Sequence, residues 1–288
     1  MDVLLATFNG EKYLEEQLES LNCQEDVNVR VWVNDDGSTD ETLAILKKWQ
    51  RKGLIKEISK SQGVGSTGAF LRLLSEHSNS EYVAFCDQDD IWDENKLSSQ
   101  LSSLVESSPM MSTCLRLYVD EAGKVIGKSK NLQNPPSFLN STFENIAPGN
   151  TIILNNAAVK VINELQNPPI FHYDAWIYLL IAAFGKVVFV PSHFVKYRIH
   201  SSNFVGLRKK SFKASTVAVK DYLNQQKFLL EKRSEILSKD QLEHLTSISL
   251  FVSEKNLRKK LSMFSRIKIG RQSKLDELLF KLLLMFLR

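Results

Sequence analysis

The sequence has few cysteines and no long apolar run. Its three cysteines, Cys23, Cys86 and Cys114, lie far apart, and their spacing fits neither a zinc-binding cluster nor a disulfide framework. We therefore expect reduced thiols in a cytosolic protein. No apolar run approaches the roughly 20 residues that a transmembrane helix needs. Met1 leads directly into a strand pattern, so we also expect no signal peptide.

A dinucleotide-binding fingerprint is also missing. Residues 63–68 (GVGSTG) form a glycine-rich loop before a helix pattern, but the acidic residue that would bind a ribose does not follow at the expected distance. The loop alone is a weak signal for a phosphate cradle. It does follow a strand pattern, so Gly63 stays a candidate ligand contact.

Charge is spread unevenly along the chain. Residues 205–288 contain 19 Lys and Arg against 8 Asp and Glu, whereas residues 1–204 contain 18 against 25. The first part therefore has a net charge of −7 and the second +11. Such asymmetry favours an acidic functional domain, residues 1–204, followed by a basic segment, residues 205–288.

Apolar periodicity predicts an α/β fold. Four short strands alternate with four helices in the first 105 residues, which is typical of a parallel sheet with covering helices. The predicted strands cover residues 2–6, 27–33, 54–58 and 82–86, and the predicted helices residues 11–21, 41–49, 69–75 and 93–105. Ser38 or Thr39 is the expected N-cap of the second helix.

The later part of the sequence is less regular. We expect a hairpin at 113–119 and 124–126, a Pro- and Asn-rich loop at 131–138, a strand at 149–154, an apolar helix at 176–184, and two strands at 186–190 and 195–199. Beyond residue 204 the pattern predicts helices rich in Lys, Arg and Leu.

The most informative stretch is EYVAFCDQDDIW, residues 81–92. Residues 82–86 fit a strand buried on both faces, and three carboxylates follow within four positions, Asp87, Asp89 and Asp90. Carboxylates this close repel one another unless a cation lies between them. Magnesium sites use one or two carboxylates together with substrate phosphates. The alternative is a solvated acidic turn that caps the next helix.

Polar loops follow all four predicted strands. They carry Thr7, Asp35 and Asp36, Gly63, and Asp87 and Asp89. Because the carboxyl ends of parallel strands meet at one edge of the sheet, we expect these residues to gather on one rim. Open α/β sheets bind their ligands there.

Three of these loops together resemble family 2 inverting glycosyltransferases, and within them the bacterial rhamnosyltransferase-like branch. The motifs are TFNGEKYL at 7–14, NDDGSTD at 34–40 and DQDDIW at 87–92. The resemblance extends over roughly residues 1–203. It implies a GT-A fold, an α/β fold whose central, mostly parallel sheet is flanked by helices, with a nucleotide-sugar part at about 1–110 and an acceptor part at about 111–204. It also implies a dTDP- or UDP-sugar donor and a divalent metal, Mn²⁺ or Mg²⁺.

The resemblance also implies roles for individual residues. Asp89 matches the metal-binding acid of the family, and His200, in the YRIH sequence at 197–200, can complete that metal site. Asp174 matches the catalytic position and would act as general base. The positions that match donor contacts are Thr7, Asn9, Glu11, Asp35, Asp36, Gly63, Asp87 and Gln88. The candidates for acceptor or diphosphate contact are Trp92, Trp176 and Arg198.

Plainer roles stay open for several of these residues. Asp174 also fits a helix N-cap, His200 a surface histidine at a strand end, and Trp92 and Trp176 core positions. At the level of function, the resemblance implies transfer of a sugar, with rhamnose favoured, to a hydroxyl of a growing bacterial surface glycan. A nucleotide-sugar-binding protein without catalysis and a nucleotidyltransferase are the alternatives. No recognised nucleic-acid-binding module is present.

The C-terminal residues 255–288 combine a basic stretch with an apolar run at 278–287. Ten apolar residues cannot span a bilayer, so we expect this run to lie in a membrane interface, with the cations on anionic headgroups. This would hold the protein at the cytoplasmic face of the cell membrane, beside a lipid-linked acceptor. The alternatives are contact with a second copy in a homodimer and packing against its own catalytic domain.

Overall fold

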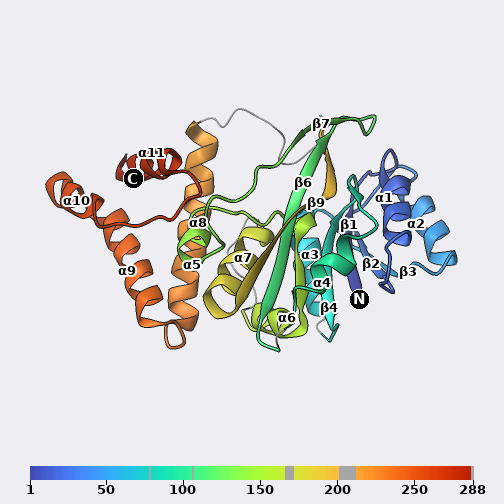
Figure 1. Ribbon diagram of the computed structural model, residues 1–288, viewed down its shortest axis with the longest axis horizontal. Helices are drawn as coiled ribbons and strands as arrows, with labels where there is room; N and C mark the ends of the chain where they lie inside the picture. The colour runs from blue at the N-terminus through green and yellow to red at the C-terminus, as the bar shows by residue number, and fades with distance from the viewer. Residues whose placement is uncertain (78, 106, 166–171, 201–211, 287–288) are drawn as a thin grey trace.

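A computed structural model describes residues 1–77, 79–105, 107–165, 172–200 and 212–286 (Figure 1). Its nine-stranded sheet has the order β3-β2-β1-β4-β8-β6-β9-β5, with β7 paired to β6. The strands are β1 (Asp2–Thr7), β2 (Arg30–Asp35), β3 (Ile55–Lys60), β4 (Tyr82–Asp87), β5 (Ile91–Trp92), β6 (Met110–Val119), β7 (Val125–Lys128), β8 (Ile153–Asn155) and β9 (Lys186–Arg198).

The first half is the predicted parallel arrangement. Strands β1 to β4 pair in parallel, and between them run the helices α1 (Leu14–Asn22), α2 (Thr42–Arg51) and α3 (Gly65–Glu76). Helix α3 begins at Gly65, four residues before the predicted start, so the glycine-rich loop forms part of its first turn. Helix α4 (Lys96–Leu101) is much shorter than the predicted helix at 93–105.

In the second half, one long strand replaces two predicted ones. We expected separate strands at 186–190 and 195–199, but β9 runs unbroken beside β6. The pairing shifts register between Cys114 and Arg116, where β9 carries extra residues that include Pro191. A bulge accommodates a proline that cannot donate to the ladder, so the sequence signal for a break marks a bulge. The hairpin of β6 and β7 is as predicted.

Two layers of helices cover the sheet and bury separate apolar clusters. Helices α1, α2 and α4 cover one face through Leu14, Leu46, Leu97 and their neighbours. Helix α3, helix α6 (Asn156–Asn163) and helix α7 (Tyr173–Phe184) cover the other. Helix α7 is apolar on nearly every side, and eight of its residues are buried. A helix of that kind must be covered on its outer side as well.

The C-terminal helices supply that outer cover. They are α8 (Phe212–Arg233), α9 (Lys239–Ser253), α10 (Leu257–Phe264) and α11 (Lys274–Phe286), and Figure 1 shows them on the side of α5 (Phe138–Ser141) and α7, far from α1 and α2. Leu229 and Leu245 join the cluster of Trp176, and Leu284 packs in a third cluster with Phe143. The expected boundary at residues 204 and 205 lies outside the described residues.

None of the described helices combines the length and the apolar character that crossing a membrane requires.

Candidate active site

The predicted rim forms where β1, β2 and β4 end. Thr7 pairs with Asp35 in register, and Asp87 pairs with Ala6 on the other side. The hydroxyl of Thr7 donates to the carboxylate of Asp35 at 2.8 Å, and both side chains are buried. The carboxyl ends of the parallel strands therefore bring the sequence-predicted residues to one edge of the sheet, as expected.

The loop after β2 folds around Asp35. Its carboxylate accepts hydrogen bonds from the hydroxyl of Ser38 at 2.6 Å and from the Ser38 amide at 3.0 Å. The amide of Thr39 donates to Asn9 at 2.9 Å. We expected Ser38 or Thr39 to cap α2, but Glu41 is the N-cap residue and makes no side-chain cap bond, while Asp40 accepts from the Thr42 amide at 3.0 Å. Ser38 and Thr39 bond to Asp35 and Asn9 instead. The bond to Asn9 ties the loop after β2 to the loop after β1.

Three residues that were predicted to contact the sugar donor form hydrogen bonds within the protein, and these bonds brace the rim. Asn9 accepts from Thr39, Glu11 accepts from the Glu41 amide at 2.9 Å, and the Gln88 amide both accepts from and donates to the Phe8 backbone, at 2.8 and 3.0 Å. Gly10 makes room for Gln88, because a Cβ there would lie 2.3 Å from its side-chain oxygen. These residues hold the rim loops together across three strands.

Asp36 binds the glycine-rich loop. Its carboxylate accepts from the amides of Val64 at 3.0 Å and Gly65 at 2.8 Å, and from the hydroxyl of Ser61 at 2.8 Å. Burial alone would raise the pKa of Asp36, but these hydrogen bonds outweigh it and lower the pKa. Gly63 has φ +69°, a conformation that glycine adopts without strain. The loop amides thus serve a carboxylate of the protein.

The acidic loop after β4 has three different environments. Asp89 Oδ2 lies 2.9 Å from His200 Nε2. Burial, followed by the charges of Asp89 and Asp174, raises the pKa of Asp87 to about 7. Asp90 is fully buried and accepts from Asn150, and burial raises its pKa well above the ordinary value. The solvated turn of the alternative interpretation does not match these burials.

Asp174 lies in the first turn of α7, one residue beyond the helix start at Tyr173. It accepts from the Ala175 amide at 2.8 Å. Burial raises the pKa of Asp174, and this effect exceeds the lowering by His172 and by hydrogen bonds from Ala175 and Asn145. A carboxylate with a raised pKa near the charges of the rim has the properties of a general base.

Two of the predicted acceptor contacts are core residues. Trp92 is 3% exposed and Trp176 0%. The Lys96 ammonium lies 3.8 Å above the centre of the Trp92 ring, and Trp176 packs edge-on against Phe228. Lys96 is itself buried, and burial lowers its pKa to about 8. The predicted acceptor role of these tryptophans is replaced by the core role that the sequence also allowed.

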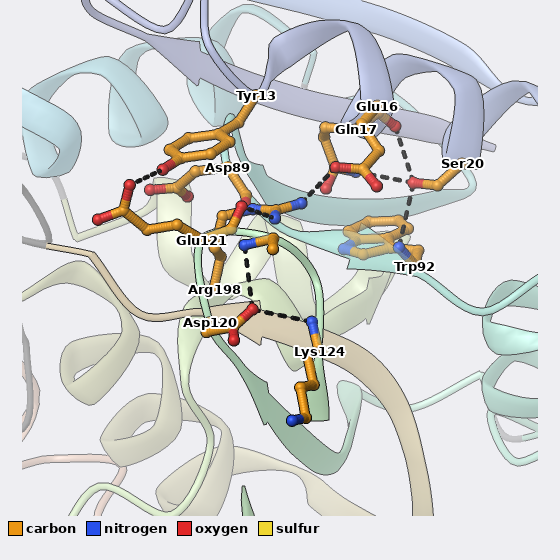
Figure 2. Close-up of polar contacts among 11 residues, drawn as sticks. Tyr13, Glu16, Gln17, Ser20, Asp89, Trp92, Asp120, Glu121, Lys124 and Arg198 are labelled. Carbon is orange, nitrogen blue, oxygen red and sulfur yellow. Dashed lines mark hydrogen bonds and ion pairs between the residues drawn. The ribbon is translucent and has the colours of Figure 1, made fainter. Parts of the chain in front are cut away.

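Arg198 is occupied by the protein, so the structure does not leave it for a diphosphate. Figure 2 shows its guanidinium between the acidic loop, α1 and the turn after β6. It donates to the backbone oxygens of Asp89 at 3.1 Å and Glu121 at 2.9 Å and forms an ion pair with Glu16. The Tyr13 ring lies 4.6 Å from it, and Tyr13 also donates to Glu121 at 3.2 Å. Arg198 thereby fixes the backbone of Asp89.

The site fits a metal held by two protein ligands. In the described part of the chain, no group of three or more His, Cys, Asp or Glu side chains is arranged to hold an ion. Asp89 and His200 do meet at the rim, where 16% of the Asp89 side chain and 10% of the His200 side chain are exposed. A hard divalent cation commonly takes few protein ligands and completes its shell with phosphate oxygens and water. This pair fits that arrangement.

Sequence reasoning missed several residues of the site. Asp90 was noted only as part of an acidic run, and Asn150, Asn145 and Arg116 were not noted at all. Asn150 comes from the 3₁₀ turn before β8 and reaches Asp90 across 60 residues. A buried asparagine in an irregular turn carries no periodic signal, whereas the third carboxylate of the DQDD sequence could have been singled out.

We expect Gly149→Ala to lower activity at least tenfold, because a Cβ at residue 149 would lie 1.8 Å from the Tyr173 hydroxyl. Tyr173 is packed between Phe70 and Phe85 and must shift at the start of α7, which moves Asp174. A misplacement of about 1 Å can cost about 100-fold in rate. Steady-state kinetics and thermal melts of this variant and of Gly127→Ala measure the effect. A Cβ at residue 127 meets Tyr118 at an ordinary 3.4 Å, and equal activity of the two variants would refute the prediction.

The fold is the GT-A fold of known glycosyltransferases. The sequence pattern described as Glycosyl transferase family 2 matches residues 2–158. The chain belongs to this family, which confirms the resemblance seen in its three motifs.

Similar protein sequences agree with this family assignment. The chain is 31% identical over 159 residues to a dTDP-rhamnosyl transferase of Shigella flexneri, covering 52% of this chain and 53% of that protein. It is 23% identical over 227 residues to a UDP-Glc:α-D-GlcNAc-diphosphoundecaprenol β-1,3-glucosyltransferase of Escherichia coli, covering 77% and 86%. The chain spans about half to three fifths of the length of the first relatives that it matches.

Solved structures share the fold. Residues 1–349 of Staphylococcus aureus TarS, in complex with UDP-GlcNAc, superpose with a TM-score of 0.65 at 18% identity, covering 92% of this chain and 78% of that one. A Pyrobaculum calidifontis mannosyltransferase in complex with GDP-Man and Mn²⁺ superposes with a TM-score of 0.53 at 14% identity, covering 91% and 83%. GT-A neighbours thus bind nucleotide sugars, with Mn²⁺ in this last case.

Proposed function

We propose that this protein transfers a sugar from a nucleoside-diphosphate sugar to an acceptor hydroxyl with inversion at the anomeric carbon. One observation carries the proposal. Asp87 and Asp174 lie within electrostatic reach of each other at the same rim as the Asp89–His200 pair. The proposed base and the proposed metal-binding pair therefore lie at the same edge of the sheet, at the carboxyl ends of the strands.

In the proposed reaction, Asp174 accepts the proton of the acceptor hydroxyl. The oxygen attacks the anomeric carbon as the bond from that carbon to the diphosphate breaks, so the nucleoside diphosphate leaves with the bonding electrons. Asp89 and His200 would hold a divalent metal, Mn²⁺ or Mg²⁺, which supplies Lewis-acid stabilisation of the diphosphate when bound. Arg198 keeps the Asp89 backbone in place. One displacement leaves no covalent sugar–enzyme intermediate, which accounts for inversion.

For the donor, we favour dTDP-rhamnose, with UDP-sugars as the second choice. The Shigella relative is named as a dTDP-rhamnosyl transferase, and the E. coli relative and TarS are named with UDP-sugars.

For the acceptor, we favour a lipid-linked bacterial surface glycan, since the name of the E. coli relative specifies a diphosphoundecaprenol acceptor. Thr7, Asp35, Asp36 and Asp87 would lie on the nucleotide side of the site.

A panel of nucleotide sugars tests the function. Each is incubated with the protein and Mn²⁺ or Mg²⁺, with or without a chelator, and release of the nucleoside diphosphate is measured. We expect release from one or a few donors and loss of release with the chelator. Binding of a nucleotide sugar without release would favour a non-catalytic binding protein. Pyrophosphate formed from a nucleoside triphosphate and a sugar phosphate would favour a nucleotidyltransferase instead.

We also propose peripheral attachment to the cytoplasmic face of the membrane through α11. The inner side of this helix packs against Phe143, and Leu284 is fully buried there. Its outer side carries four leucines spaced as one helical stripe, 41% to 66% exposed: Leu275, Leu278, Leu279 and Leu282. The predicted apolar run is therefore divided between intramolecular packing and an exposed stripe.

The basic residues divide in the same way. Lys260 is buried over Phe251 at 5.3 Å, and Arg271 lies 4.9 Å from the Phe280 ring and donates to Phe143. Six cations between α9 and α11 stay exposed: Lys255, Arg258, Lys259, Arg266, Lys268 and Lys274. Each cation close to an anionic bilayer contributes about 1 kcal/mol, so this set supports reversible attachment.

We expect the double substitution Leu278→Gln and Leu279→Gln to reduce co-sedimentation with anionic liposomes while the protein stays folded. Both side chains are about half exposed, so their loss removes interfacial contact and little core. Ending the chain before α11 would instead remove Leu284 from its cluster, which confounds binding with folding. Ile126→Gln, at an exposed apolar residue of β7, is the control. Wild-type protein that ignores anionic vesicles at low salt, or that forms dimers lost in the double variant, would refute the membrane proposal.

A further inference from the structure

Arg116 lies on the stretch of β6 that continues past the rim. Ala84 of β4 and Ser112 of β6 both pair with Ile153 of β8, and the two outer strands run in the same direction. Counting along each strand, Asp87 ends β4 at the level of residue 115. Arg116 therefore lies one step beyond the end of the central strand, beside the acidic loop.

Aromatic rings hold the Arg116 guanidinium in place. Its central carbon lies 4.7 Å from the ring of Tyr197 and 5.9 Å from the ring of Tyr118. The side chain is partly exposed. A guanidinium that stacks on aromatic faces keeps its N–H groups free to donate in the plane of the fork.

Two other cations near the rim have protein acceptors, whereas the Arg116 guanidinium has none among the described residues. Arg198 donates to three acceptors, and Lys12 forms an ion pair with Glu121. Within the described residues, the guanidinium of Arg116 makes no hydrogen bond and no ion pair with a carboxylate. Its backbone bonds to Ser129: the amide donates to the Ser129 hydroxyl, and the carbonyl accepts from the Ser129 amide. Its donors are therefore available to a ligand.

The charge of Arg116 acts on the site. Asp87 and Asp90 both lie within electrostatic reach of the Arg116 guanidinium. A rim with several carboxylates repels an incoming diphosphate, and an arginine fork bonds phosphate oxygens in pairs. A stacked arginine without protein acceptors at such a rim is suited to that task.

We propose that Arg116 binds a phosphate group of a substrate, either the diphosphate of the donor or the diphosphate of a lipid-linked acceptor. The inference rests on the proposed function, because both ligands belong to that reaction. It gives Arg116 the phosphate contact that sequence reasoning assigned to Arg198.

Titration calorimetry with nucleotides tests the proposal. Affinities for UDP, dTDP, uridine and thymidine, each with Mn²⁺, are measured for wild type, Arg116→Gln, Arg116→Lys and the control Arg51→Gln, at an exposed residue ending α2. Hydrogen bonds to charged groups contribute about 1.5–3 kcal/mol, or roughly 10- to 100-fold in affinity. We expect Arg116→Gln to lose that factor for the diphosphates and to leave the nucleosides unchanged. Arg116→Lys should fall between, because it keeps the charge but not the fork.

A second arm separates the two sources of phosphate. KM is compared for a glycan acceptor carrying a lipid diphosphate and for the same glycan without it. A rise in KM of Arg116→Gln confined to the diphosphate acceptor, with unchanged UDP affinity, assigns the contact to the acceptor. Unchanged diphosphate affinity and unchanged KM values, or equal losses for nucleosides and diphosphates as a structural defect gives, overturn the proposal. Wild-type protein that binds UDP and dTDP no better than the nucleosides overturns the proposed function as well.

Discussion

Replacing Asp174 with asparagine is expected to lower turnover by about 10²- to 10⁴-fold, the usual cost of losing a general base, while donor affinity stays the same. Asparagine keeps the shape and can still accept from the Ala175 amide, but it cannot take the acceptor's proton. Single-turnover kinetics and donor titration separate the two effects. Asp240→Asn, in the exposed first turn of α9, is the matched control.

The pH dependence of catalysis should also show that Asp174 acts as the general base. Since burial raises the pKa of Asp174, the acid limb of kcat/KM should lie above the range of an ordinary aspartate. The stability of the folded protein depends on the same pKa. The raised pKa of Asp174 stabilises the folded state fully at pH values below the pKa that Asp174 has in the unfolded chain, and this contribution is lost as the pH rises through the pKa in the folded state. Asp174→Asn should therefore melt higher than wild type at neutral pH, with the difference vanishing in acid. Lower donor affinity with normal turnover of bound donor, or a trapped glycosyl-enzyme, would contradict this assignment.

Asp89→Ala is expected to abolish transfer without unfolding the protein. The substitution removes one of the two metal ligands proposed here and the partner of His200 at 2.9 Å, yet Arg198 still holds the backbone of residue 89. Activity, metal affinity and thermal melts are measured together, with Asp93→Ala, an exposed acid that follows β5, as control. A well-folded Asp89→Ala protein with wild-type turnover, or wild-type protein fully active in excess chelator, would exclude metal-assisted transfer through this residue.

Local pattern was sufficient for the first half of the fold. Each strand from β1 to β4 is a short apolar run followed by polar loop residues, and a parallel sheet brings those loops to one edge by geometry alone. The second half depends on contacts that are distant in sequence. The short β8 owes its place to pairing with both β4 and β6, and Pro191 interrupts a periodic pattern without interrupting β9.

The same distinction applies to the site. Asp89 and Asp174 stand in recognisable local motifs, so their positions were predicted. Which of Arg198 and Arg116 finds protein acceptors was not predictable from the sequence. Arg198 meets Glu16, Glu121 and Asp89 from three separate segments, and no spacing in the sequence records that meeting.

The placement of α7 has a consequence for synthesis of the chain on the ribosome. This helix carries Asp174, and its outer side is covered by Phe228, Leu229 and Leu245. These residues come more than 40 positions after the helix ends at Phe184. Until they emerge, a strongly apolar helix with Trp176 stays uncovered, the kind of surface that makes nascent chains prone to aggregate. Slower translation, or a bound chaperone, over the last 60 residues should therefore affect the yield of active protein more than the same delay earlier in the chain.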